Sequence, residues 1–177
     1  MEKQPTVFNT SLKYGLIGGL ILIIVATLLY MTLSPSSTMQ GILAFFINTG
    51  VCVAIGIFAI KSYRDEVSGG AISFSKAFIV SFLSILITGI LLAFFQMVYF
   101  TIIDPGYQEE IINNLRIMYE DMGMEESAIE MAMYWVELFQ HPIISLFWNI
   151  FMYTLGSALL SLVTGLIMKR EEPQVNL

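Results

Sequence analysis

The chain has 177 residues, of which 56% are hydrophobic and only 12% are charged, and its mean hydropathy is +0.77. Because a soluble domain is about 45–50% apolar and about 25% charged, this composition excludes a typical soluble enzyme, a disordered chain and a disulfide scaffold. The net charge of −6 disfavours a nucleic-acid partner, since phosphate binding needs a surplus of Lys and Arg. We therefore expect an integral membrane protein in contact with the lipid bilayer.

Four long runs without charge predict four transmembrane helices. Twenty helical residues rise about 30 Å, which matches the hydrocarbon thickness of a bilayer. A signal peptide is the competing interpretation of the first run, but its apolar stretch would be about 7–15 residues long and would end in small residues. The first run is longer and lacks that ending, so we expect an uncleaved span. The expected spans are residues 14–33, 41–60, 77–103 and 142–168.

Basic residues predict the orientation of these spans. If the chain crosses the membrane four times, seven of its eight Lys and Arg residues fall on one side, and Arg116 alone falls on the other. Lys and Arg are retained on the cytoplasmic side, so we expect an inner-membrane protein with both termini in the cytoplasm. The cytoplasmic segments are then residues 1–13, 61–76 and 169–177, and the outer segments are a turn at 34–40 and a longer segment at 104–141.

The outer segment 104–141 carries nine acidic residues and predicts an amphipathic helical hairpin between spans three and four. Asp104-Pro105 is a helix-start signal, and Gly123 is a helix-stop signal. Apolar residues recur at helical spacing on both sides of Gly123. The stripes comprise Ile111, Leu115, Met118 and Met122 in the first helix, and Ile129, Met133, Val136 and Phe139 or Gln140 in the second.

The second hairpin helix has weaker boundary signals. Ser127 and Glu130 have the spacing of a capping box, and the helix either continues into the fourth span or breaks at His141-Pro142. The acids of the hairpin are interpreted either as a solvated face or as a surface that attracts a partner or a cation. No EF-hand spacing is present, so the sequence predicts no calcium site.

Catalytic and metal-binding chemistry has little support in the sequence. The chain has one cysteine, Cys52, and one histidine, His141, so it can form neither an internal disulfide nor a Cys-rich zinc site nor a histidine pair. The serine-hydrolase pattern Gly-x-Ser-x-Gly and the zinc-protease pattern His-Glu-x-x-His do not occur. We expect a protein that is not an enzyme and that holds no metal and no cofactor.

The interiors of the four spans contain no Asp, Glu, Lys, Arg or His, which argues against a proton-coupled transporter. Small and polar neutral residues recur four positions apart, beginning with Gly15 and Gly19 in the first span, and such residues allow helices to approach closely. They indicate packing seams of a four-helix bundle. Five polar residues either belong to these seams or line a polar cavity that opens outward: Asn48, Gln96, Tyr99, Asn149 and Tyr153.

Two short segments carry a family resemblance. The loop sequence Gly70-Ala71-Ile72-Ser73-Phe74, followed by Lys-Ala-Phe, and the run from Tyr99 to Pro105 at the end of span three resemble a Bacteroidetes membrane-protein family catalogued as domain of unknown function 4199. The resemblance extends over residues 8–170. It implies a bacterial inner-membrane protein with four spans, but it implies no activity and no catalytic residue. The apolar residues of the loop also predict an anchor at the membrane interface.

The most direct functional hypothesis is a non-enzymatic scaffold or interaction protein of the bacterial inner membrane, acting through its acidic outer hairpin, which would bind another protein. The alternative is a passive channel or carrier for a small neutral or cationic solute, with a path formed by oligomers. In that case the acidic segment would raise the local concentration of cations. The residues leave the oligomeric state open.

Overall fold

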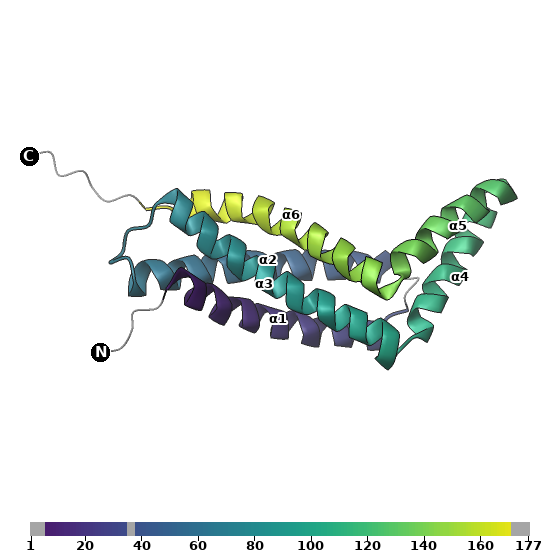
Figure 1. Ribbon diagram of the computed structural model, residues 1–177, viewed down its shortest axis with the longest axis horizontal. Helices are drawn as coiled ribbons and strands as arrows, with labels where there is room; N and C mark the ends of the chain where they lie inside the picture. Colours follow the sequence, from purple (N-terminus) through teal and green to yellow (C-terminus); the bar gives the residue numbers. More distant parts are fainter. Residues whose placement is uncertain (1–5, 35–37, 171–177) are drawn as a thin grey trace, which may run out of the picture.

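The computed structural model describes residues 6–34 and 38–170, and it is all-α, as predicted. Four long helices lie side by side in a bundle, and a helical hairpin projects from one end and leans towards the side of α6 (Figure 1). The elements are α1 (Val7–Thr32), α2 (Thr38–Glu66), α3 (Phe74–Val98), the π-helical turn η1 (Tyr99–Ile103), α4 (Gly106–Asp121), α5 (Glu126–Gln140) and α6 (Pro142–Met168).

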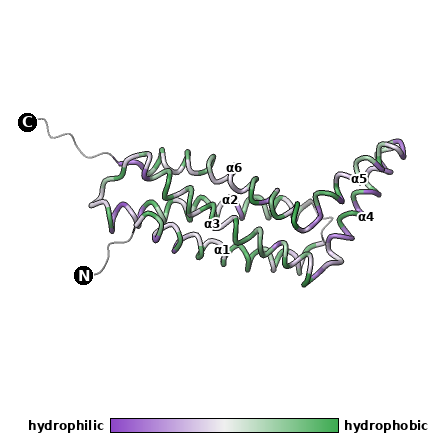
Figure 2. Tube along the Cα trace, viewed as in Figure 1, coloured by the Kyte–Doolittle hydropathy of each residue, from purple (hydrophilic) through white to green (hydrophobic). Residues whose placement is uncertain are grey.

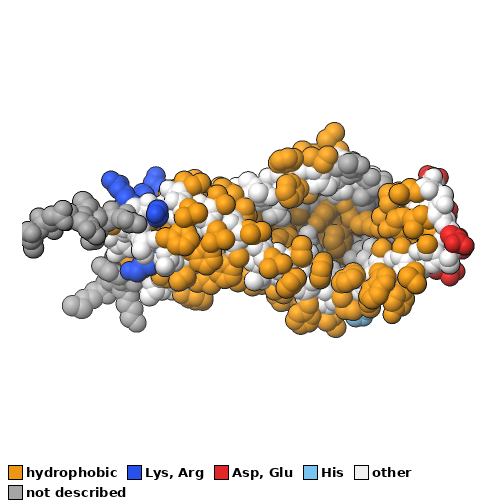
Figure 3. All heavy atoms as spheres, turned by 90° about the horizontal axis from the view of Figure 1, so that it is seen from above, with side chains coloured by type: hydrophobic (Ala, Val, Ile, Leu, Met, Phe, Trp, Pro, Cys, Tyr) orange, Lys and Arg blue, Asp and Glu red, His pale blue; other side chains and the backbone are white. Residues whose placement is uncertain are grey.

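Four helical segments are long and apolar enough to cross a membrane, which makes this a multi-pass membrane protein in contact with lipid. They are Val7–Thr32, Met39–Glu66, Phe74–Ile103 and Pro142–Met168. Figure 2 shows hydrophilic residues gathered towards the two ends of the molecule, and Figure 3 shows Lys and Arg at one end and Asp and Glu at the other. We call these the basic end and the hairpin end.

α1, α2 and α3 extend beyond the uncharged runs from which the spans were predicted, and α3 begins at Phe74 and includes Lys76. α1 begins at Val7, where the Thr6 hydroxyl accepts a hydrogen bond from the Asn9 N–H at 3.2 Å, and α2 continues to Glu66. All three extensions contain polar or charged residues, because a helix continues through such residues when no breaker is present. Residues 35–37 of the predicted outer turn and the tail at 171–177 lie outside the described residues, and residues 38–40 of that turn already belong to α2.

α3 is the central helix and packs along both α1 and α6. The predicted seam at Gly15 and Gly19 is confirmed, because these glycines lie directly against Ile87 and Leu91 of α3. A Cβ added at Gly15 would lie 2.6 Å from the Ile87 Cβ. The two helix backbones therefore approach more closely than any larger residue would allow.

Hydroxyl groups join the same three helices inside the bundle. The Ser11 hydroxyl donates to the carbonyl of Val80 at 3.1 Å, which links α1 to α3. The hydroxyls of Ser81 and Thr164 lie 2.8 Å apart, and the Ser161 hydroxyl donates to Ser81 at 3.2 Å, which links α3 to α6. Each hydrogen bond across membrane helices contributes about 0.6 kcal/mol on average.

The loop between α2 and α3 is tied to the end of α6. Gly69 and Gly70 adopt positive φ angles of 65° and 96°, which only glycine adopts readily. Ile72 and Arg170 then exchange two backbone hydrogen bonds of 2.8 and 2.9 Å. The predicted interfacial anchor is wrong for Ile72, because this pairing turns its side chain into the core at the basic end.

The hairpin begins and turns where the sequence predicts. Asp104 accepts a hydrogen bond from the N–H of Tyr107 at 3.2 Å before α4, and α4 ends at Asp121, two residues before Gly123, which turns the chain with a φ of 72°. α5 breaks from α6 at His141, because the residue before a proline disfavours helical backbone. The hairpin and the fourth span are therefore separate helices that meet at an elbow.

Two predictions about the hairpin are wrong. Ser127 is not a helix cap, since α5 begins at Glu126 with Glu125 in the capping position. Met118 and Met122 are exposed, whereas Ile129 and Met133 are buried as expected. Near the tip of a hairpin each helix has only one neighbour, so part of a wide apolar stripe remains uncovered.

Candidate functional site

A cleft of about 340 Å³ separates α2 from α6 in the half of the bundle nearer the hairpin. Figure 3 shows the surface to be hollowed between the middle of the bundle and the hairpin. The cleft is lined by Ala44, Phe45, Asn48, Thr49 and Cys52 of α2, Ile85 of α3, and Tyr153, Gly156, Ser157 and Leu160 of α6.

Polar groups meet at one place in this cleft. The Cys52 thiol donates to the Asn48 amide oxygen at 3.5 Å, and the Tyr153 hydroxyl also interacts with the Asn48 side chain. The rest of the lining is mostly apolar, and none of the lining residues carries a charge. The cleft can thus hydrogen-bond a neutral group through Asn48 and Tyr153, but it offers no charged partner to an ion.

A smaller cavity of about 50 Å³ lies on the other side of Asn48, between α1, α2 and α3. Gln96 lines it and donates from Nε2 to the hydroxyl of Tyr30 at 3.1 Å. The other amide atom of Gln96, Oε1, is buried without a hydrogen-bond partner, which is unusual because an unsatisfied buried acceptor costs about 1–3 kcal/mol. Gln96 thus brings an unsatisfied acceptor into the buried region beside this cavity.

The structure brings together three of the five polar residues singled out from the sequence. Asn48 and Tyr153 share the cleft, and Gln96 shares the smaller cavity with Asn48. Asn149 lies apart, because its Nδ2 donates to the carbonyl and hydroxyl oxygens of Ser145 in its own helix at 2.8 and 3.3 Å. Tyr99 belongs to a separate aromatic cluster.

Sequence reasoning missed Tyr30, the partner of Gln96. Lys13 and Lys76 mark the same end of α1 and α3, which run in parallel, and Tyr30 and Gln96 lie at similar distances beyond them along the chain. A comparison of these sequence separations would have predicted the contact between Tyr30 and Gln96.

The aromatic cluster joins the hairpin to the bundle. The rings of Tyr30, Tyr99, Phe100 and Tyr107 have centroids 4.9 to 6.4 Å apart. The buried Gln40 side chain of α2 donates to the Tyr107 hydroxyl. Burial raises the pKa of Tyr107, while this hydrogen bond opposes the increase. Together these contacts hold the first turn of α4 against α1 and α2.

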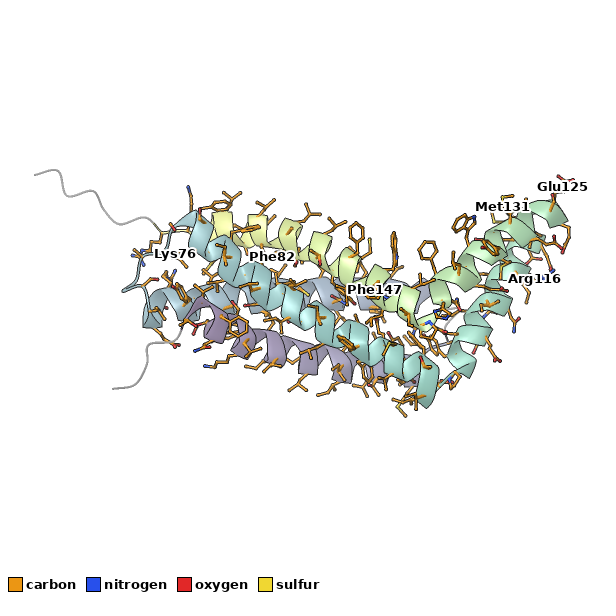
Figure 4. The ribbon with its side chains drawn as sticks, in the orientation of Figure 1. Lys76, Phe82, Arg116, Glu125, Met131 and Phe147 are labelled. Atoms are coloured by element: carbon orange, nitrogen blue, oxygen red, sulfur yellow. The ribbon has the colours of Figure 1, made fainter. Side chains whose placement is uncertain are left out.

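The hairpin carries most of its charge at its tip and along its outer side. Arg116 forms ion pairs with Glu120 at 3.2 Å and Glu126 at 2.8 Å, and these contacts raise the pKa of the guanidinium. Figure 4 shows Glu125 at the tip and Arg116 on the outer side. Among residues 6–34 and 38–170, no group of three or more His, Cys, Asp or Glu side chains is arranged to hold a metal ion.

The basic end has a cavity of its own, of about 540 Å³. Lys76 and Arg170 line it together with the serines of the α2–α3 loop, so its charge is opposite to that of the hairpin. The molecule therefore presents a basic surface and an acidic surface separated by the length of the membrane-spanning bundle.

The four apolar helices and the uncharged cleft between them define a multi-pass membrane protein of the four-helix-bundle class. The chain belongs to the family described as "Protein of unknown function (DUF4199)", which it matches over residues 13–170. This result confirms the resemblance found in the loop and at the end of span three. No curated protein and no solved structure matches the chain.

Proposed function

We propose that this protein is a non-enzymatic interaction protein of the bacterial inner membrane, and that its hairpin binds a protein partner outside the cytoplasm. The observation that carries the proposal is the row of exposed acids on α5. Glu126, Glu130 and Glu137 recur at helical spacing and are all exposed, while the segment 104–141 contains a single Lys or Arg residue, Arg116. A partner with a basic surface would complement this row, because opposite potentials favour encounter and fix orientation.

The charge distribution supports the proposed orientation, with both termini in the cytoplasm. The described Lys and Arg residues other than Arg116 lie towards the basic end, and cytoplasmic segments retain such residues. Cysteines introduced by Glu126→Cys and Ser68→Cys, in a Cys52→Ala background, test the orientation in intact cells. An impermeant thiol reagent should label the first variant and not the second, and the reverse pattern would refute the orientation.

Site-specific photo-crosslinking tests the partner. A photo-crosslinking amino acid at Glu130 should give a discrete protein adduct in living cells, whereas the same group at Leu159, which is exposed on a membrane-spanning helix, should not. Adding Glu126→Gln and Glu137→Gln should reduce the adduct about tenfold if charge directs binding. An adduct of equal yield at both positions, or one insensitive to the two neutral substitutions, would contradict the proposal.

The α2–α6 cleft favours a second candidate, a passive channel or carrier for a small neutral or cationic solute. Asn48 and Tyr153 give the cleft a polar site within the spanning region. Fluxes of glycerol and rubidium in reconstituted vesicles test this function. Asn48→Leu should abolish a flux through the cleft, whereas the matched change Asn149→Leu should leave it intact, because Asn149 does not line the cleft. If vesicles that contain the wild-type protein show no flux of glycerol or rubidium, this result would count against a channel or carrier function.

A further inference from the structure

We infer that α5 docks on the surface of the bilayer beside α6 through an exposed aromatic face. This face consists of Met131, Tyr134, Trp135 and Phe139, which are 68%, 62%, 53% and 41% exposed. The inference concerns a different side of α5 from the acidic row, so it holds whether or not the hairpin binds a protein partner.

The exposed face is separate from the face that holds the hairpin together. Ile129 and Met133 are buried, and they lie on the side of α5 that packs against α4. At 100° per residue, Met131 lies opposite the midpoint between Ile129 and Met133, and Trp135 lies about 140° from that midpoint. α5 therefore has two apolar faces, and α4 covers only one of them.

The exposed face continues without a break onto the membrane-spanning surface. Neighbouring ring centroids are 5.7 Å apart between Tyr134 and Trp135, 6.5 Å between Trp135 and Phe139, and 5.2 Å between Phe139 and Trp148. Trp148 lies 5.9 Å from Phe151 in α6, and both are exposed on a helix that crosses the membrane. The row of rings crosses the elbow at His141, so lipid that covers α6 reaches the base of α5.

The acidic residues of α5 lie on the opposite side of the helix from Trp135 and Phe139, and Tyr134 lies at the border between the two sides. Glu126, Glu130 and Glu137 lie at spacings of four and seven, on another side of the helix from Trp135. Figure 4 shows Met131 on the side of the hairpin that faces the elbow, with Glu125 at the far tip. An amphipathic helix with this separation lies in the membrane interface, where Trp and Tyr are enriched.

The length of the spans favours the same position. The spans of 26 to 30 residues exceed the about 20 residues that cross the hydrocarbon, so the bundle tilts or projects into the head groups. α5 directly precedes α6 in the chain, and the hairpin leans towards the side of α6 (Figure 1). Phe139 and Trp135 should accordingly lie deepest and Met131 should lie shallowest. Since the face has no basic residue, docking should not require anionic lipid.

The two tryptophans of the chain allow a direct test in the full-length protein. Trp148→Phe leaves Trp135 as the only reporter, and Trp135→Phe leaves Trp148 as a control within the span. Each variant is reconstituted in zwitterionic phosphatidylcholine vesicles, with bromine atoms placed either high or deep on the acyl chains. Trp135 should be quenched more by shallow bromines than by deep ones, and iodide in the water should quench it at least about threefold less than free tryptophan.

Two outcomes would overturn the inference. Strong iodide quenching of Trp135 without bromine quenching would place this face in water. Protection from both quenchers would mean that protein covers the face, either a second copy of the chain or a partner. Circular dichroism checks that the Trp→Phe variants remain helical, and quenching of Trp148 by bromolipid checks that the spans are inserted in the vesicles.

Discussion

Replacing Gly15 by alanine should separate α1 from α3. An alanine Cβ at this position would lie 2.6 Å from the Cβ of Ile87, 2.7 Å from its Cγ2 and 3.0 Å from the carbonyl oxygen of Ser84, whereas ordinary contacts are 3.4 to 4 Å. The Ile87 Cβ is attached to the backbone and cannot rotate away. The helices must therefore move apart by roughly 1 Å to relieve the contact.

The expected loss of stability combines two costs and one gain. Overpacking of this kind costs about 1–3 kcal/mol. The movement also lengthens the 3.1 Å hydrogen bond from the Thr88 hydroxyl to the Gly15 carbonyl, which contributes about 0.6 kcal/mol. Alanine gains about 1 kcal/mol of helix propensity over glycine. We expect Gly15→Ala to lower the free energy of unfolding by about 0.5–2.5 kcal/mol.

Gly50→Ala is the matched control, because Gly50 also lies within a membrane-spanning helix but has no heavy atom within 4 Å of an added Cβ. It receives the same propensity gain without the clash, so its stability should be unchanged or higher by up to about 1 kcal/mol. The assay is equilibrium unfolding in mixed micelles by increasing fractions of a denaturing detergent. Equal stability of the two variants would refute the close packing of α1 on α3.

Three further predictions use the same assay. Ser81→Ala removes the hydrogen bonds to Thr164 and Ser161 and should cost about 1 kcal/mol, and an unchanged midpoint would contradict these contacts. Tyr107→Phe removes the hydrogen bond from Gln40. Because burial raises the pKa of Tyr107, the stability advantage of the wild type should be constant below about pH 10 and should fall as the pH rises further, and a pH-independent difference would refute it. Arg116→Gln should cost less than about 1 kcal/mol because its ion pairs are exposed, and the cost should shrink in high salt.

Hydropathy and backbone signals predicted much of this fold. Long uncharged runs are sufficient to indicate spanning helices, and Gly123 and His141-Pro142 carry backbone constraints that act locally. The close approach at Gly15 was also predictable, because small residues four positions apart have a direct steric consequence. Each of these features depends on a few neighbouring residues.

Features that depend on which helices are neighbours were harder to predict. In a soluble protein a hydrophobic stripe identifies the buried face of a helix. In a membrane protein the lipid-facing side of a helix is as apolar as the side packed in the interior, so hydrophobicity does not distinguish these two sides. Asn48 and Asn149 are the same residue type in similar spans, yet only Asn48 lies in the cleft. Ile72 was misplaced for a related reason, since its burial depends on pairing with Arg170, far along the chain.

The pairing of Ile72 with Arg170 sets an order for assembly. The two residues are 98 positions apart, so the backbone hydrogen bonds between them can form only after both segments have been synthesised. During synthesis, α1, α2 and α3 can associate through their glycine and serine contacts before α6 emerges. The basic end then closes last, when residue 170 has left the ribosome and its backbone completes the pair with Ile72.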